Sequence, residues 1–384
     1  MLEFAQIAAG PFTGSLLADL GADVVKIERP DGGDGMRGWP PLHPGENESD
    51  LFSGNFTSLN RNKRSVTLDI KNKADVERLY TLVGHADVFL ENFRPGALVR
   101  SGLGYEQLKL RNSRLIYCSL TGYGQTGRYA QKGAFDVTVQ AMSGVMSVTG
   151  EPDGAPVKCG VPVGDFVTGL YGAYAILAAT IRARQTGQGA YIDCSILGSL
   201  LGISALQTSE YFGTGKPPRR LGSAHPRNAP YAGFHASDKP FTIAAGNDKL
   251  WRDTCVIVGL PDLPDDPRFV TQSLRAQNQD QLTAVLQPVF ATRTAAEWLA
   301  AFDAKGVPCA PINDFAEILA DPHVREMGWV QDITMPNGAL AETFGFPVDI
   351  SGFAFEIDRM PPQLGEHNDE VFDEWTQRCA ARAL

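Results

Sequence analysis

One acidic residue, Asp165, stands where a carboxylate could act as a nucleophile. It follows the short apolar run 161–164 and precedes a helix-like segment from Leu170 to Arg182. The free N–H groups and the positive end of a helix can hold an acid ionised, while apolar surroundings remove its water. Such a carboxylate can attack an activated acyl group. The alternative interpretation is that Asp165 is simply the N-cap of the helix, a position that favours aspartate.

Other kinds of site find little support in the sequence. The six cysteines, at positions 118, 159, 194, 255, 309 and 379, form neither a CxxC pair nor a Cys/His cluster with zinc spacing. We therefore expect reduced core cysteines and no metal site. The net charge of -10 argues against nonspecific nucleic-acid binding, which needs a basic surface. An anionic ligand would have to be met by local positive groups.

Length and composition are those of a soluble enzyme. A chain of 384 residues is expected to form two or three subregions, and its 43% hydrophobic and 20% charged content is ordinary for a globular protein. No apolar run approaches the roughly 20 residues that span a bilayer, and the first residues lack the features of a signal peptide. We expect a cytoplasmic protein that does not cross or bind a membrane.

Alternating strands and helices are predicted for the part of the chain before Asp165. Strands are expected at 2–7, 22–27, 65–68, 87–91 and 113–119, and helices at 11–20, 73–83 and 105–110. This alternation predicts a parallel sheet with crossover helices. Glu28 follows the first glycine turn at about the distance seen in dinucleotide-binding folds. The turn Ala9-Gly10-Pro11 is not GxGxxG, however, and its proline lacks a donor for a pyrophosphate, so no NAD site is expected.

The pattern changes after Asp165. A helix-rich stretch runs to about residue 214, and a segment rich in Pro, Gly and Arg at 215–222 is typical of a linker. A smaller region with its own signals, strands at 233–235 and 241–245 and a helix at 295–304, extends to about residue 307. Further helices and a strand at 330–335 follow. A small domain inserted into a larger one fits this order.

Eight short motifs occur in a characteristic order along the chain. They are Ala9-Gly-Pro11, Leu16-Leu-Ala-Asp-Leu-Gly-Ala-Asp-Val-Val-Lys-Ile-Glu28, Asn62-Lys-Arg-Ser-Val-Thr-Leu-Asp69, Glu91-Asn-Phe-Arg-Pro-Gly96, Phe135-Asp-Val-Thr-Val-Gln140, Gly164-Asp165, Gly306-Val-Pro-Cys309 and Leu364-Gly-Glu-His367. Together they closely resemble the class III CoA-transferases, also called the CaiB/BaiF or formyl-CoA transferase family. The resemblance covers essentially the whole chain.

The resemblance implies an α/β fold, with a Rossmann-like large domain built from both chain ends and a smaller inserted α+β domain. The implied boundaries are a first large-domain part at 1–200, a linker at 201–222, the small domain at 223–308, and a linker plus the second large-domain part at 309–384. It also implies a homodimer of two interlocked chains. Asp165 aligns with the catalytic aspartate of the family, a role compatible with an N-cap.

The implied activity moves CoA from an acyl-CoA to a carboxylic acid through an aspartyl anhydride and an aspartyl-CoA thioester. CoA and acyl-CoA would be substrates, with no tightly bound cofactor. Small dicarboxylates such as succinate, glutarate, mesaconate or itaconate are the acids expected from the habit of the family.

Six positions match residues that contact CoA in the family: Ile7 through its main chain, Arg29, Leu68, Asn92, Phe93 and Arg100. Guanidinium groups suit phosphates, and apolar side chains suit the walls of such a site. Without the resemblance, the arginines would be interpreted as solvated surface charges, and Leu68 and Phe93 as core residues. Weaker cationic candidates are Lys63, Arg64, Arg94 and Lys132.

Two departures from the family concern substrate choice. Ala8 replaces the side chain that contacts substrate in formyl-CoA transferase, and the segment 222–230 replaces the glycine-run loop of that enzyme, which argues against formyl-CoA and oxalate. In this segment, His225 and Arg227 would meet a substrate carboxylate or cap a loop.

Two other functions remain open. The α-methylacyl-CoA racemases share the fold but have a histidine before the acid that aligns with Asp136, where this chain has Phe135, so the base for proton exchange is missing. Asp136 itself is a weaker substrate-site candidate. A noncatalytic acyl-CoA-binding protein would have no need of the carboxylate of Asp165.

Overall fold

The computed structural model describes residues 1–382 of the chain, with side chains for residues 1–375. It divides into two compact units. The first comprises residues 1–145, 158–216 and the chain from 323 onward, and thus contains both chain ends. The second comprises residues 146–157 and 217–322.

A six-stranded parallel sheet forms the centre of the first unit. In sheet order its strands are β5 (Lys63–Thr67), β2 (Val24–Glu28), β1 (Leu2–Phe4), β6 (Val88–Glu91), β7 (Ile116–Thr121) and β8 (Ala190–Ser195). Counted by their appearance in the chain, the strands lie in the order 3-2-1-4-5-6. The order therefore reverses between β1 and β6, and ligands of such sheets bind at the carboxyl ends of the strands at this point.

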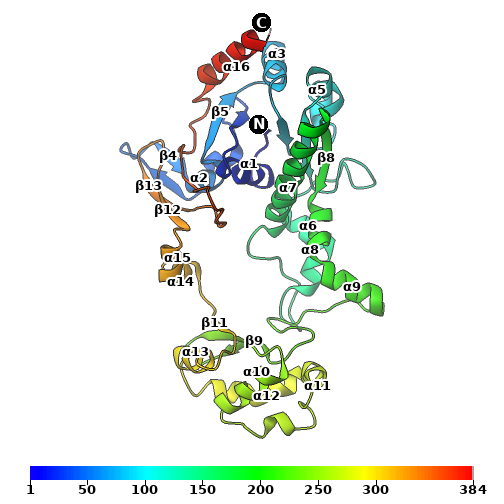
Figure 1. The fold of residues 1–384 in the computed structure, drawn as a ribbon, viewed down its shortest axis with the longest axis vertical. Coiled ribbons are helices and arrows are strands. Elements are labelled where there is room, and N and C mark those ends of the chain that lie inside the picture. The colour runs from blue at the N-terminus through cyan, green and yellow to red at the C-terminus, as the bar shows by residue number, and fades with distance from the viewer. Residues whose placement is uncertain (383–384) are drawn as a thin grey trace. The chain divides into compact units, whose positions relative to one another are not determined.

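Helices cover both faces of this sheet, as Figure 1 shows. On one face, α3 (Lys73–Val83), α5 (Tyr105–Arg111) and α16 (Asn368–Arg382) cover a core of aliphatic and aromatic side chains that includes Leu79, Leu108 and Val371. On the other face, α1 (Ala9–Asp19) and α7 (Val163–Thr186) pack over a core that includes Leu17, Leu120 and Ile176. Because α16 packs against α3 and β5, the C-terminal part of the chain completes the first of these two layers.

Shorter elements surround the sheet. They are the 3-10 helix η1 (Gly35–Gly38), the hairpins β3 (Leu42–Pro44) with β4 (Leu51–Ser53) and β12 (Val330–Thr334) with β13 (Leu340–Phe344), and the helices α2 (Gly54–Asn60), α4 (Ala97–Arg100), α6 (Asp136–Ser143), α8 (Ile196–Ile203), α9 (Ala205–Thr214) and α15 (Pro322–Glu326). The 3-10 helix η2 (Val145–Val148) lies where the chain passes from the first unit to the second. Of the shorter helices, α8 directly follows β8, and Asp136 of α6 and Ile196 of α8 line one pocket.

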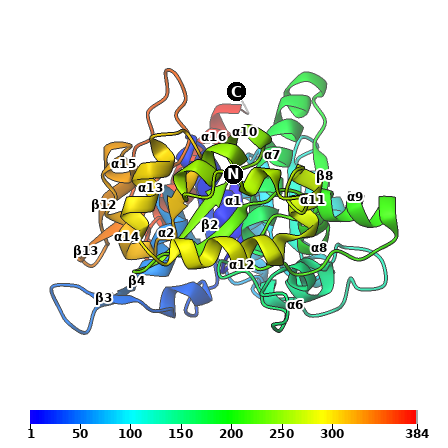
Figure 2. The same cartoon turned by 90° about the horizontal axis from the view of Figure 1, so that it is seen from below.

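The second unit contains an antiparallel sheet in the order β11 (Cys309–Pro311), β10 (Pro240–Ala244) and β9 (Tyr231–His235). Its helical elements are α10 (Asp248–Ile257), η3 (Leu263–Asp265), α11 (Gln272–Gln277), α12 (Gln279–Phe290), α13 (Ala295–Asp303) and α14 (Phe315–Leu319). Figure 2 shows α12 and α13 in yellow. The unit has its own aromatic core, in which Trp251, Phe290 and Trp298 are fully buried.

Two predicted elements differ from the structure, and the structure contains strands that were not predicted. The strand expected at 2–7 ends at Phe4, because the backbone N–H groups of Gln6 and Ile7 bond to side chains rather than to a neighbouring strand. The stretch expected to be helical up to residue 214 contains the strand β8, a partly exposed edge strand with weak hydrophobic alternation. The hairpin partner β13 was not predicted.

The helix after the motif Gly164-Asp165 begins earlier than the sequence suggested. It starts at Val163, with Pro162 as its N-cap, so the interpretation of Asp165 as an N-cap is wrong. No strand precedes it, since residues 158–162 are irregular. By length and composition alone, α7 is also apolar enough to cross a bilayer, contrary to the expectation that no run approached that length.

Candidate active site

A pocket of about 220 Å³ lies where the strand order reverses, and Asp165 lines it. The segment after β1 contributes Ile7 and Ala8, the segment after β6 contributes Asn92, and α6 contributes Asp136. This is the position at which the topology of a doubly wound sheet predicts a ligand. The pocket belongs entirely to the first unit.

Close packing of α7 on α1 brings Asp165 to this pocket. The hydroxyl of Thr13 in α1 donates to the carbonyl of Gly169, one turn after Asp165, at 3.2 Å. A Cβ atom at Gly169 would meet Phe12 at 2.7 Å and the Ala9 carbonyl at 3.1 Å, so only glycine permits this approach. The rings of Phe12 and Phe166 lie 4.8 Å apart. The first turns of the two helices are thereby fixed side by side.

The N-terminus of α1 is the other polar feature of the pocket. No side chain caps it, and within the described residues the N–H groups of Ala8, Ala9 and Gly10 have no hydrogen-bond partner. A Cβ atom at Gly10 would lie 2.2 Å from that of Ala5, which explains the glycine of the motif. Proline has no backbone N–H, and Pro11 lies in the first turn of α1, where a residue's N–H would have no partner within the helix in any case.

The backbone N–H groups of the two residues that flank Asp165 in α7 are already bonded, unlike those at the start of α1. The N–H of Phe166 bonds to the carbonyl of Pro162 at 3.1 Å, as the helix requires. The N–H of Gly164 bonds to the carboxylate of Asp136 at 2.8 Å. Within the described residues, two of the unpaired N–H groups at the start of α1 belong to Ala8 and Ala9, which line the same pocket as Asp165.

Burial, and then the charge of Asp136, raise the pKa of Asp165 from 3.8 to about 6. Within the described part of the chain, no hydrogen bond stabilises the Asp165 carboxylate. Asp136, in contrast, is held by two bonds, because its second oxygen accepts from the side chain of Gln140 at 2.6 Å. Asp136 is thus a fixed neighbour, while Asp165 is a desolvated carboxylate facing the pocket.

A larger pocket of about 530 Å³ adjoins the first and shares Gln6 and Phe93 with it. Leu68 and Phe93 form part of its apolar wall, and Arg29 lines it as an exposed cation. Lys71 also lines this pocket and was missed in the sequence. Its position three residues after Leu68, in the same loop, was the signal that could have identified it.

The remaining site residues predicted from the sequence lie in three different settings. The side-chain amide of Asn92 is bonded at both ends to the main chain of Gln6, at 3.0 and 2.7 Å. Arg100 is an exposed residue of α4 that lines neither of the two pockets. His225 and Arg227 belong to the second unit, where the His225 ring stacks on Tyr231 and accepts from two backbone N–H groups.

The four weaker cationic candidates separate into two pairs. Arg94 and Lys132 line the pocket of Asp165. Lys63 is fully buried in an ion pair with Glu3, and Arg64 is paired with Asp23, so neither is placed to bind a ligand.

A comparison with known protein families assigns the chain. The model of CoA-transferase family III matches residues 1–368. The chain belongs to this family. As a family III CoA-transferase, also described as CaiB/BaiF, it is an enzyme that uses an acyl-CoA and a carboxylic acid.

Relatives and solved structures agree with the assignment. The chain is 39% identical, over 97% of its length and 94% of the relative, to a succinate–glutarate CoA-transferase of Agrobacterium fabrum. It is 37% identical to a succinyl-CoA:glutarate CoA-transferase of Mus musculus, over 97% of this chain and 85% of the relative. The crystal structure of a CaiB/BaiF family protein from Brucella suis superimposes with a TM-score of 0.86 at 39% identity, covering 97% of both chains.

Proposed function

We propose that this family III CoA-transferase moves CoA between small dicarboxylic acids, with Asp165 as the nucleophile. One observation carries the proposal: a half-buried carboxylate, with a pKa raised to about 6, lines the same pocket as the uncapped N-terminus of α1, at the reversal point of the sheet. A carboxylate with a raised pKa is more basic than a free one, and it is still mostly ionised at neutral pH.

The first half of the reaction transfers CoA from the donor to Asp165. An oxygen of Asp165 attacks the thioester carbonyl of the donor, the C–S bond breaks, and CoA leaves as a thiolate. This forms a mixed anhydride between Asp165 and the donor acyl group. The thiolate then attacks the aspartyl carbonyl, the anhydride C–O bond breaks, and the donor acid departs. Asp165 now carries CoA as a thioester.

The second half repeats these steps with the acceptor acid. Its carboxylate attacks the aspartyl thioester and again releases CoA thiolate, which attacks the acyl carbon of the acceptor and frees Asp165. Each tetrahedral intermediate carries a negative oxygen, and the free N–H groups of Ala8 and Ala9 are the donors positioned to stabilise it. Every step exchanges one activated acyl bond for another, so ATP is not required.

The residues around the pocket support a dicarboxylate as the acid. Arg94 and Lys132 both line the pocket, and a cation there would bind the second carboxylate of a dicarboxylic acid while the first reacts. The named relatives from Agrobacterium fabrum and Mus musculus transfer CoA between succinate and glutarate. We therefore take succinate and glutarate as the first pair to test.

The larger pocket suits the CoA moiety of the donor. Its apolar wall, formed in part by Leu68 and Phe93, would contact the pantetheine arm or adenine, and Arg29 and Lys71 would bind the phosphates. Because the two pockets adjoin at Gln6 and Phe93, a thioester could reach Asp165 from this side.

We also propose that the enzyme is a homodimer, as the family resemblance implies. The helix α7 supports this, because its exposed face carries an apolar stripe at helical spacing: Leu170, Tyr174, Leu177 and Ile181. A second copy of the chain would cover such a stripe.

A trapping experiment tests the proposed function. Purified protein is incubated with succinyl-CoA and glutarate, and CoA esters are followed by mass spectrometry. Glutaryl-CoA should form, and hydroxylamine should convert Asp165 alone to a hydroxamate. Asp165→Asn should abolish both while leaving the affinity for CoA within about tenfold. Labelling at Asp136, or transfer by the Asn variant above a few per cent of wild type, would assign the nucleophile elsewhere.

A further inference from the structure

The backbone next to the candidate oxyanion donors has an unusual conformation. Ile7 has a φ of 69°, in the left-handed region that β-branched residues avoid. It directly precedes Ala8, whose N–H is one of the free donors of α1. A strained residue at a functional site persists only where its surroundings hold it in place.

The carboxylate of Asp34 accepts the backbone N–H of Ile7. Both oxygens of its carboxylate lie 3.1 Å from the Ile7 nitrogen, and one also accepts the N–H of Met36 at 3.0 Å. The second oxygen forms an ion pair with Lys26 at 2.9 Å, and the side chain of Lys26 is fully buried. On the other side of this peptide, Asn92 clamps both main-chain groups of Gln6.

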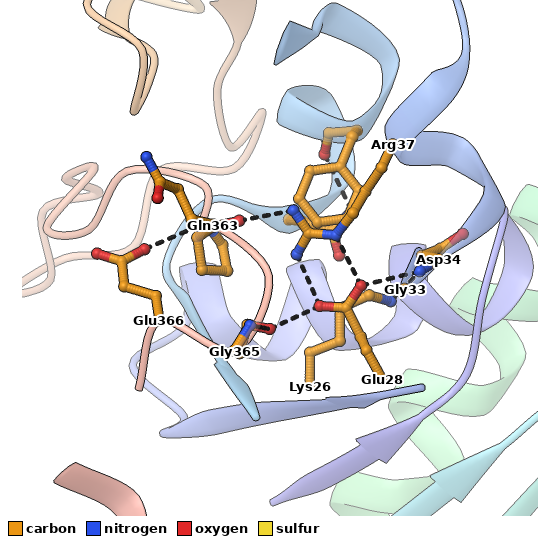
Figure 3. Close-up of polar contacts among 12 residues, drawn as sticks. Lys26, Glu28, Gly33, Asp34, Arg37, Gln363, Gly365 and Glu366 are labelled. Carbon is orange, nitrogen blue, oxygen red and sulfur yellow. Dashed lines mark hydrogen bonds and ion pairs between the residues drawn. The ribbon is translucent and has the colours of Figure 1, made fainter. Parts of the chain in front are cut away.

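The loop that carries Asp34 is itself anchored to the C-terminal segment of the chain. Figure 3 shows Glu28 between Asp34 and Arg37: it accepts the N–H of Asp34 at 2.9 Å and pairs with Arg37 at 2.7 Å. Arg37 also donates to the carbonyl of Pro362 at 2.9 Å. The hydroxyl of Ser65 links Glu28 to the N–H of Gly365.

This buried network is electrically balanced. Three carboxylates, on Glu3, Glu28 and Asp34, face three cations, on Lys26, Lys63 and Arg37. Burial alone would lower the pKa of Lys26, but Glu3 and Asp34 outweigh it and raise that pKa above its usual value. Only one of the carboxylates, that of Asp34, reaches the backbone of Ile7.

We propose that Asp34 is a positioning residue for the transfer reaction. Its carboxylate fixes the left-handed conformation of Ile7 and thereby orients the free N–H groups in the first turn of α1 toward the carbonyl that reacts with Asp165. The inference rests on the proposed function for the identity of that carbonyl. It assigns Asp34 no contact with substrate.

The structure supplies a matched control for the test. Asp34→Asn and Glu3→Gln each remove one carboxylate from the same buried network and from the same lysine, Lys26. Both should lower the thermal midpoint, because each leaves a buried ammonium with fewer partners. Among the described residues, the Glu3 side chain makes its ion pairs with Lys26 and Lys63, and it makes no contact with Ile7, so its loss leaves the contact between Asp34 and Ile7 intact.

Two readouts distinguish positioning from stability. In Asp34→Asn, hydrogen exchange of the peptide containing residues 5–12 should accelerate about tenfold or more. The kcat should fall about 10- to 100-fold, in the range expected for misplaced oxyanion donors, with the KM for acyl-CoA within about threefold. In Glu3→Gln, both exchange in this peptide and kcat should stay within about threefold of wild type. Equal losses of kcat in the two variants, or unchanged exchange in Asp34→Asn, would overturn the proposal.

A double variant covers the case in which Asp34→Asn folds poorly. Asp34→Asn with Lys26→Met restores the charge balance, so folding should recover while kcat stays low. Recovery of kcat along with stability would assign Asp34 a purely structural role. Ile7→Gly provides a further test, because glycine adopts positive φ without strain. In the Ile7→Gly background, the loss of kcat caused by Asp34→Asn should be at least about threefold smaller than in the wild-type background. Equal losses of kcat in the two backgrounds would contradict the mechanism.

These outcomes separate the inference from the proposed function. Exchange of the 5–12 peptide is measured without any substrate. If wild-type protein fails to transfer CoA, the proposed function fails, while the difference in exchange between Asp34→Asn and Glu3→Gln still decides whether Asp34 holds Ile7.

Discussion

Replacing the candidate nucleophile should make the protein more stable while abolishing its activity. In the folded chain the pKa of Asp165 is about 6, compared with 3.8 for an ordinary aspartate. The difference means that folding disfavours the ionised carboxylate, since burial removes water and no hydrogen bond within the described residues replaces it. Asparagine fills nearly the same volume without the charge.

The size of the effect follows from linkage. Each pKa unit corresponds to about 1.4 kcal/mol, so the penalty approaches about 3 kcal/mol as an upper bound, reduced because Asp165 is only partly buried. Above pH 6 Asp165 is ionised in both the folded and the unfolded chain, and the free energy of unfolding of wild type is lowered by the full amount. Between pH 6 and 3.8 the folded chain takes up the proton first, so the penalty shrinks, and below 3.8 it vanishes.

Urea denaturation of wild type and Asp165→Asn at several pH values measures this difference. At pH 8 the variant should have a free energy of unfolding higher by about 1 to 3 kcal/mol, and the gap should close as the pH falls to 4. Glu77→Gln, at an exposed carboxylate of α3, changes the net charge equally and serves as the control. An Asp165→Asn variant no more stable than wild type at pH 8 would refute the argument that this carboxylate is desolvated.

Three further predictions concern pH, the CoA pocket and assembly. The kcat/KM of wild type should fall tenfold per pH unit below about pH 6, where Asp165 takes up a proton. Asp136→Asn should move this acidic limb of the profile to lower pH, because the charge of Asp136 raises the pKa of Asp165. An acidic limb that does not move would exclude an effect of Asp136 on the pKa of Asp165. Arg29→Ala should raise the KM for acyl-CoA more than it lowers kcat, whereas Arg100→Ala, outside both pockets, should change the KM less. With a truncated donor that lacks the nucleotide, the KM of Arg29→Ala should equal that of wild type. Light scattering should give a dimer mass that stays constant on dilution to nanomolar concentration, with no exchange between tagged and untagged chains over hours, and a folded active monomer would rule out an interlocked pair.

The alternation of strands and helices was predictable because its signals are local. The helix at 73–83 has the predicted bounds, and all five strands predicted before Asp165 have both ends within three residues of the observed ones. The edge strand β8 was missed because a short strand that is partly exposed on both faces shows little periodicity. The start of α7 was placed too late because Val163 and Gly164 are poor helix formers, and tertiary contacts of Gly164 and Gly169 compensate for this.

The chemistry of Asp165 was predictable in kind but not in its setting. The motif indicated an acid near a helix end, whereas its pKa depends on Asp136, which lies 29 positions earlier and is held by Gln140 and Gly164. The same limit applies to cations. Lys63 is buried against Glu3 and Lys71 lines the larger pocket, and this difference is set by tertiary contacts rather than by residue type.

The least predictable feature is the conformation of Ile7. Local preference alone would put an isoleucine in an extended conformation, and the strand predicted over residues 2–7 followed that preference. The structure overrides it with two side chains from distant loops, Asp34 and Asn92, which take the N–H groups that a longer strand would have used. The departure from local preference occurs next to the free donors of α1, and strain of this kind tends to be retained where it contributes to function. In other sequences of family III CoA-transferases, the first positions to compare are therefore those whose side chains bond to the backbone of Gln6 and Ile7, rather than those that line the pocket.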